Sequence, residues 1–203
     1  MIIRLTWVES RIHELSGLVQ RGFEVQALLG LSIREVLCNQ LLMTQDYLDN
    51  HVNTIFLNGK SVDDVDVTLI EPGAVLALSA SMPGFVGAAF RKGGHYALMR
   101  REISHVLGKK LVTVQPGMFI LKLYNAVAKD WLAHFISHGI TVKAVDLLAF
   151  LSTQSEGFWT GCIGGTLDGI SISRDMLLGK LSEQNPNASV DLVVSPGTAE
   201  RSH

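Results

Sequence analysis

A capped helix followed by two tight-turn signals constrains the fold of this chain more than any other feature. Ser32 is followed three residues later by Glu35, the spacing of a capping box, in which each residue's side chain bonds to the other's backbone amide. Apolar residues then recur at helical spacing. Asn58-Gly59 and Pro72-Gly73 are dipeptides typical of tight turns, and each lies beside a short apolar run. The pattern predicts a mixed fold of helices and short strands.

Short apolar stretches on both sides of this helix predict the strands of a sheet. Residues 2–7 alternate apolar and polar side chains, which is typical of a half-buried strand. We expect residues 23–29 to return antiparallel to that strand, and residues 54–57 and 74–78 to form two more. Pro83-Gly84 then closes the module. The sequence predicts one domain over residues 1–84, with the capped helix packed across a mixed sheet.

This order of elements resembles the small sulfur-carrier proteins of thiamin and molybdopterin biosynthesis, which are ubiquitin-like β-grasp domains. The resemblance rests on residues 55–59 (Ile-Phe-Leu-Asn-Gly), on residues 69–78 and on the capped helix. It implies a β-grasp domain over residues 1–84 and suggests that this domain has a protein partner. The carriers act through a free C-terminal Gly-Gly, whereas here Gly84 follows a proline, precedes Phe85, and is followed by more than a hundred residues. The resemblance therefore implies a fold and leaves carrier chemistry unsupported.

The rest of the chain predicts a second module. We expect residues 85–108 to form a connector with a helix, residues 109–194 to form an α/β domain, and residues 195–203 to form a disordered tail. The expected elements are strands at 111–115 and 118–123 joined by a turn at Pro116-Gly117, a helix at 126–138, a strand at 140–145, a helix at 173–181 and a strand at 190–194. Residues 147–151 fit a strand or a helix. This order is consistent with a ferredoxin-like sandwich, so the predicted fold class is α+β.

Composition limits the partners of the chain. The formal net charge is −2, which predicts no bulk attraction to nucleic acid or to anionic membranes. Charged residues make up 18%, below the usual quarter or so, and mean hydropathy is +0.28. Burial of the excess apolar surface between subunits predicts a homo-oligomer.

No membrane span or secretory leader is expected either. Residues 73–90 carry no charge and approach the length of a membrane span, but Pro83 and three glycines interrupt them. A buried strand followed by a turn explains this segment better. The N-terminal residues alternate like a strand and lack the long apolar run of a leader. We therefore expect a cytoplasmic protein.

The stretch 157–165 is the most unusual in the sequence, because four glycines surround a cysteine there. Glycines let backbone amides converge on an anion, and a thiol becomes a nucleophile when a neighbour lowers its pKa. The candidates are Gly161, Gly164 and Gly165 for cofactor binding, and Cys162 with His95 for catalysis; His105, His134 and His138 are alternative bases. The competing interpretation, a glycine-rich hairpin with a buried cysteine, is the one that the sequence favours. No specific cofactor is indicated.

Other polar clusters favour a solvated surface over a site. Asp130, His134 and His138 are spaced by four and would share one stripe of a helix, where two histidines can bind a metal. They lie at the polar edge of the apolar face, so we predict no metal site. The basic residues between 91 and 101 and the acidic residues between 63 and 66 are read as solvated segments.

Two functional hypotheses follow. The first is a non-catalytic binding or assembly protein built on a sulfur-carrier-like β-grasp domain. The alternative is an enzyme with an interdomain site that uses Cys162 and a histidine, linked to sulfur or cofactor metabolism. A carrier released by cleavage after Gly84 ranks third. The sequence leaves open whether the protein is an enzyme.

Overall fold

The computed structural model describes residues 1–80, 90–92 and 113–198. The chain divides into two compact units, and each is described by itself. Unit 1 combines residues 1–23 with residues 129 onward, and unit 2 comprises residues 24–128. This division differs from the expected boundaries after residues 84 and 108, because the two ends of the chain share one unit. The expected connector, 85–108, lies outside the described residues except for Phe90–Lys92.

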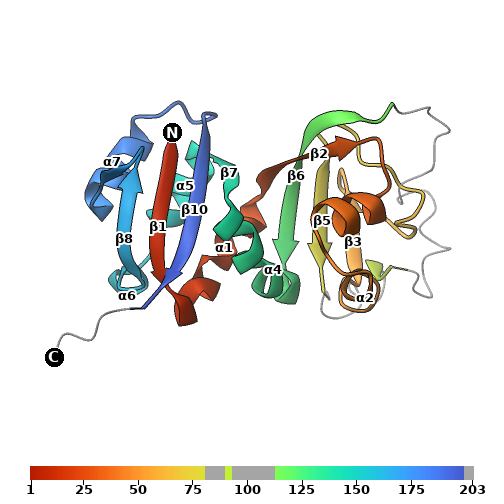
Figure 1. The fold of residues 1–203 in the computed structure, drawn as a ribbon, viewed down its shortest axis with the longest axis horizontal. Helices are drawn as coiled ribbons and strands as arrows, with labels where there is room; N and C mark the ends of the chain where they lie inside the picture. Colours follow the sequence, from red (N-terminus) through yellow and green to blue (C-terminus); the bar gives the residue numbers. More distant parts are fainter. Residues whose placement is uncertain (81–89, 93–112, 199–203) are drawn as a thin grey trace. The chain divides into compact units, whose positions relative to one another are not determined.

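Unit 1 contains a mixed sheet whose central strand is the N-terminal one. Its strand order is β7 (Ile140–Lys143), β10 (Ser189–Gly197), β1 (Ile2–Val8), β8 (Cys162–Leu167) and β9 (Ile170–Ser171) (Figure 1). β1 runs parallel to β10 and antiparallel to β8. Both edges of β1 are thus occupied, so the expectation that residues 23–29 pair with β1 is wrong.

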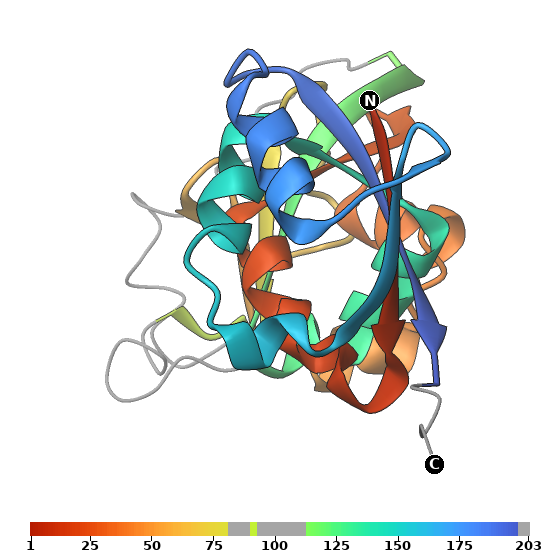
Figure 2. The same ribbon diagram turned by 90° about the vertical axis from the view of Figure 1, so that its left-hand side faces the viewer.

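Helices cover one face of this sheet. They include η1 (Glu9–Leu15), α1 (Ser16–Arg21), α5 (Ala144–Leu151), α6 (Glu156–Trp159) and α7 (Arg174–Ser182). Figure 2 shows α5 and α7 together on one side of the strands, and alternate residues of β1, namely Ile3, Leu5 and Trp7, are buried. The undecided residues 147–151 are therefore helical. The expected tail is wrong at its start, since residues 195–197 extend β10 and pair with β1.

α4 (Asn125–His138) and the strands of unit 2 complete the fold. The order within unit 2 is β4 (Lys60–Ser61), β3 (Thr54–Leu57), β5 (Val75–Ser79), β6 (Gln115–Tyr124) and β2 (Phe23–Leu29). β3 is antiparallel to both β4 and β5, whereas β5 and β6 are parallel. Asn58 and Gly59 join β3 to β4 with φ angles of 51° and 77°, which confirms the predicted tight turn.

The expected turn at Pro116-Gly117 is wrong, because both residues lie inside the continuous strand β6. Pro116 precedes Ile120, the first residue that pairs with β5, so its missing N–H costs no bond in that ladder. A Cβ on residue 117 would lie 2.9 Å from Cδ1 of Leu29 and 3.4 Å from Cγ of Pro72. The glycine thus serves close packing, and β6 belongs to unit 2 rather than to a separate module.

The capping box at the start of the helix is confirmed. Oε2 of Glu35 accepts hydrogen bonds from the Ser32 backbone N at 2.9 Å and from its Oγ at 2.7 Å, and the Glu35 backbone N donates to Ser32 Oγ at 3.2 Å. The helix continues as the π-helical segment η2 (Glu35–Gln40), and α2 (Gln45–Asn50) follows. Within the described ranges, none of the helices is both long and apolar enough to cross a membrane.

Candidate functional site

A cavity of about 240 Å³ lies beside β8 in unit 1, and we call it the β8 cavity. Its wall includes Trp159, Cys162, Gly164, Gly165, Ser173 and Arg174, together with apolar side chains. Three of the predicted site residues, Cys162, Gly164 and Gly165, therefore lie on one wall. Gly161 is not among the wall residues.

Two helix caps and one tight turn position the residues that line the β8 cavity. The hydroxyl of Ser155 accepts a hydrogen bond from the Phe158 backbone N at 3.3 Å and starts α6, which carries Trp159. The hairpin from β8 to β9 turns at Asp168-Gly169, where φ is 48° and 86°. The chain returns to Ser173, whose hydroxyl caps α7, so Arg174 is the first residue of that helix.

Two of the three candidate glycines have a packing reason to be glycine. A Cβ on Gly161 would lie 2.8 Å from Nε1 of Trp7, and a Cβ on Gly165 would lie 3.0 Å from Cδ2 of Leu5. A Cβ on Gly164 would meet nothing closer than 3.9 Å. The absence of a side chain at residues 161 and 165 thus leaves room for Trp7 and Leu5, the buried side chains of β1. The role of these two glycines in binding a cofactor stays a prediction.

The Cys162 thiol lies in surroundings that keep it protonated. The residue is half-buried, and its Sγ donates to the Gly164 carbonyl oxygen at 3.5 Å. Burial raises the pKa of this thiol, because the charged thiolate loses solvation. No histidine contributes to the described wall of the cavity. His95 lies outside the described residues, so its pairing with Cys162 stays a prediction.

The alternative histidines that the structure describes lie on α4. Nδ1 of His138 is 2.7 Å from the carbonyl oxygen of His134, and the two rings are 4.8 Å apart. Among the described residues, no group of three or more metal-ligating side chains comes together.

Arg174 and Trp159 are the functional candidates that sequence reasoning missed. The Arg174 guanidinium lies 5.2 Å from the centre of the Trp159 ring, and its Nη1 forms an ion pair with Glu156. Its Nε and the Trp159 Nε1 are buried without a hydrogen-bond partner among the described residues. A tryptophan inside a glycine-rich stretch and an arginine directly after a helix-capping serine were the available signals.

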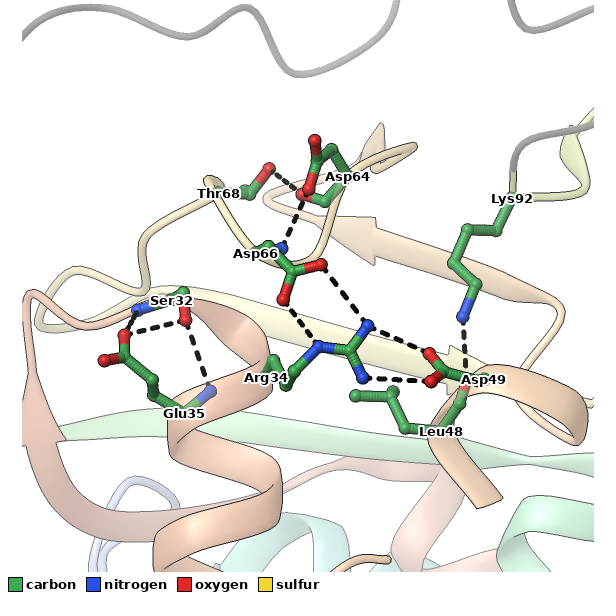
Figure 3. Close-up of polar contacts among 9 residues, drawn as sticks. All are labelled: Ser32, Arg34, Glu35, Leu48, Asp49, Asp64, Asp66, Thr68 and Lys92. Atoms are coloured by element: carbon green, nitrogen blue, oxygen red, sulfur yellow. Dashed lines mark hydrogen bonds and ion pairs between the residues drawn. The ribbon is translucent and has the colours of Figure 1, made fainter. Parts of the chain in front are cut away.

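Unit 2 holds a cluster of charges around Arg34 (Figure 3). Its Nε binds Asp66 Oδ1 at 2.5 Å, and its two terminal nitrogens bind both carboxylate oxygens of Asp49 at 2.9 and 3.1 Å. Asp66, then Asp49, raises the pKa of Arg34, and the hydrogen bonds from Arg34 lower the pKa of Asp49. The acidic segment 63–66, expected to be solvated, is thus tied to the helix at Asp66.

Lys92, also expected in a solvated segment, is engaged as well. Its Nζ donates to the Leu48 carbonyl oxygen at 2.8 Å, and its backbone N donates to the Asn53 oxygen at 2.7 Å (Figure 3). Burial lowers the pKa of this amine. These bonds hold residue 92 against α2 and the residues that follow it, so this cluster has a structural role.

A larger hollow of about 430 Å³ lies on the sheet of unit 2, and we call it the sheet hollow. It is lined mainly by Phe56, Val75, Ala77, Ser79, Tyr124 and Asn125. In β5, Leu76 and Leu78 are fully buried, whereas Val75 and Ala77 between them are half-exposed. The hollow therefore occupies the opposite face of the sheet from that core.

Small residues create this hollow. Ala77 lies opposite Phe56 in the β3–β5 ladder, and Ser79 lies opposite Tyr124 in the β5–β6 ladder. Nδ2 of Asn125 donates to the Ser79 hydroxyl at 2.9 Å. The hollow thus combines apolar walls with a small polar group, a composition that is typical of binding pockets.

Comparison with known proteins adds no relative. No protein-family model matches the chain, and neither the curated proteins nor the solved structures include a match.

Proposed function

We propose that this chain is a cytoplasmic, non-catalytic binding or assembly protein, and that the sheet hollow is the surface on which a second copy docks. The main support for this proposal is the lining of the hollow, where the large side chains of Phe56, Val75 and Tyr124 are half-exposed. Such concave apolar surfaces are the usual places for binding. A net charge of −2 produces only weak electrostatic repulsion between two copies of the chain. A mean hydropathy of +0.28 favours burial of further apolar surface between them.

We further infer that unit 2 is a β-grasp-like module of the kind found in sulfur carriers. Its support is the mixed sheet, the capped helix beside it, and the confirmed turn at Asn58-Gly59. In this proposal β6 supplies the strand that we expected from residues 2–7. For unit 1 we propose a ferredoxin-like sandwich that includes β1, supported by a central parallel pair, β1 and β10, between antiparallel neighbours.

The proposal sets aside two chemical alternatives. An enzyme of sulfur or cofactor metabolism would need an activated thiol at Cys162, and burial raises the pKa of that thiol instead. A carrier would need a free carboxylate at Gly84, and in this chain that carbonyl is bonded to Phe85. Binding without covalent chemistry is the function that both units support best.

Sedimentation velocity at micromolar concentration tests the docking surface. Wild-type protein should sediment as a dimer, and Phe56→Lys should sediment as a monomer because it places a charge in the sheet hollow. The matched control is Met118→Lys, which changes another exposed apolar residue of unit 2 outside the hollow, and it should remain dimeric. A wild-type monomer of 22.1 kDa, or a Phe56→Lys dimer as stable as wild type, would overturn the proposal.

A further inference from the structure

The side chain of Gln40 binds both backbone groups of one residue of β2. Its Oε1 accepts a hydrogen bond from the Leu28 backbone N at 2.7 Å, and its Nε2 donates to the Leu28 carbonyl oxygen at 3.0 Å. In an antiparallel strand pair, one residue exchanges the same two bonds with a single residue of the next strand. The primary amide of Gln40 carries the same donor and acceptor side by side. At Leu28 a side chain therefore takes the place of a strand.

These two groups of Leu28 lie on the edge of β2 that faces away from β6. β2 is the last strand in the order of unit 2, and β6 is its neighbour there. The N–H and C=O of one strand residue point to the same edge, and the Leu28 N–H is already used by Gln40. The Leu28 side chain is 46% exposed. Without Gln40, this edge would offer free backbone groups beside an exposed apolar side chain, which favours pairing with another chain.

The two end strands of unit 2 differ in how well their own sequences resist such pairing. β4, at the other end of the order, has only two residues and begins with the exposed Lys60. Short edge strands that carry lysine pair poorly with other chains. β2 has seven residues, and residues 25–29 carry no charge. This end of the sheet therefore depends on a device outside the strand itself.

The helix that carries Gln40 ends in an unfavourable backbone geometry. η2 is π-helical, and the Leu41 backbone N donates to the Val36 oxygen, five residues earlier, at 3.1 Å. Leu42 then has a φ of 63°, in the left-handed region that strains a leucine, although its side chain is 68% exposed. Single π turns are rare and occur mostly at functional positions. This geometry at the residues around Gln40 favours a specific role for its side chain.

We propose that Gln40 guards the edge of β2 and prevents unit 2 from pairing, edge to edge, with an extended segment of a second copy of the chain. Its amide satisfies the Leu28 backbone groups that such a segment would need. This inference concerns the edge of β2, whereas the proposed docking surface is the sheet hollow. Either can fail without the other.

Amide hydrogen exchange of the full chain, followed residue by residue in nitrogen–proton correlation spectra, tests the bond. Gln40→Met keeps the length of the side chain and removes its amide. The Leu28 amide should exchange at least roughly threefold faster in this variant, because it loses the acceptor that Gln40 provides. The amides of Ala27 and Leu29 face the opposite edge and should change less. An equal change at all three would indicate general destabilisation and count against the proposal.

Sedimentation velocity from micromolar to millimolar concentration tests the guarding role. Gln40→Met should form species larger than those of wild type, in a fraction that rises with concentration. Gln26→Met is the matched control, because it makes the same substitution at an exposed residue of β2 whose side chain forms no hydrogen bond among the described residues. It should sediment as wild type does.

Gln40→Glu separates the bond from the guarding role and remains informative if Gln40→Met fails to fold. Its carboxylate still accepts from the Leu28 N–H but cannot donate to the carbonyl oxygen. The Leu28 amide should stay protected, and the charge should keep this edge from pairing.

Three results would overturn the proposal. They are unchanged exchange of the Leu28 amide in Gln40→Met, sedimentation of Gln40→Met identical to that of wild type, and loss of Leu28 protection in Gln40→Glu as large as in Gln40→Met. Each comparison is made with wild type in its own oligomeric state, so the outcome does not depend on docking at the sheet hollow.

Discussion

Replacement of Gly161 by alanine tests why the glycine-rich stretch is rich in glycine. The new Cβ would lie 2.8 Å from Nε1 and 2.9 Å from Cε2 of Trp7, and 3.1 Å from the carbonyl oxygen of Phe158. These distances are shorter than ordinary contacts, so something must move. Trp7 is completely buried and packs against the rings of Phe158 and Trp159 at 4.8 and 6.5 Å. The tryptophan therefore has no free space into which it can shift.

The expected cost is that of an overpacked core, about 1–3 kcal/mol. For a chain of this size each kcal/mol corresponds to roughly 2–4 °C in Tm. The matched control is Gly157→Ala in α6, where the new Cβ would meet only the Ser155 hydroxyl at 3.7 Å. Alanine is the better helix former, so this variant should be neutral or more stable by up to about 1 kcal/mol.

Differential scanning calorimetry and urea unfolding of both variants measure the difference. Gly161→Ala should unfold several degrees below wild type and Gly157→Ala should not. If Gly161→Ala were as stable as wild type, Trp7 would not be packed against residue 161 as described, and the glycine would be free for a binding role instead.

Two further predictions concern unit 2. Ser32→Ala should destabilise the protein by about 0.5–2 kcal/mol in urea unfolding, because it removes the hydroxyl that accepts from the Glu35 backbone N; an unchanged midpoint would show that the cap contributes nothing. Arg34→Met should cost about 0.4–2 kcal/mol at pH 7, from 0.2–1 kcal/mol for each exposed pair with Asp49 and Asp66. Because Arg34 lowers the folded pKa of Asp49 below its unfolded value of about 3.9, this stabilisation is present above that pH and is lost as pH falls through the folded pKa. Unfolding measured from pH 7 to pH 2 should show the wild type losing its advantage over Arg34→Met at the acid end; a constant difference would contradict the role assigned to Asp49.

Sequence patterns predicted the elements whose signals are local. The capping box at Ser32, the Asn58-Gly59 turn and the helix that starts after Ser173 depend on residues within a few positions of each other. Pairing between distant strands has no such signal. β1 pairs with β10, for example Ile3 with Leu192, but neither segment contains a residue pattern that identifies the strand with which it pairs. The division into units was missed for this reason.

Pro116-Gly117 shows how one local pattern can serve two structures. The dipeptide is common in turns, yet here the glycine lets Leu29 and Pro72 approach a strand. Charged segments raise the same difficulty, because Asp66 and Lys92 look solvated until their partners, Arg34 and the Leu48 carbonyl, are known.

The candidate site was predictable in part. The glycine-rich stretch placed Cys162, Gly164 and Gly165 on one wall because they are neighbours in a single strand. Arg174 joins them only through the β8–β9 hairpin, whose closure depends on Asp168 and Gly169. The unpartnered state of its Nε is a property of packing, which no spacing in the sequence reveals.

The reactivity of Cys162 tests most directly whether this protein binds rather than catalyses. The measurement is the rate of alkylation against pH in the folded protein, in a Cys38→Ala background so that a single thiol reports. Because burial raises the pKa of Cys162, labelling should be slow at neutral pH and should rise only above the ordinary thiol pKa of about 8.5. Rapid labelling that persists below pH 7 would reveal a stabilised thiolate, contradict the non-catalytic account, and favour an enzyme that uses Cys162 with a histidine.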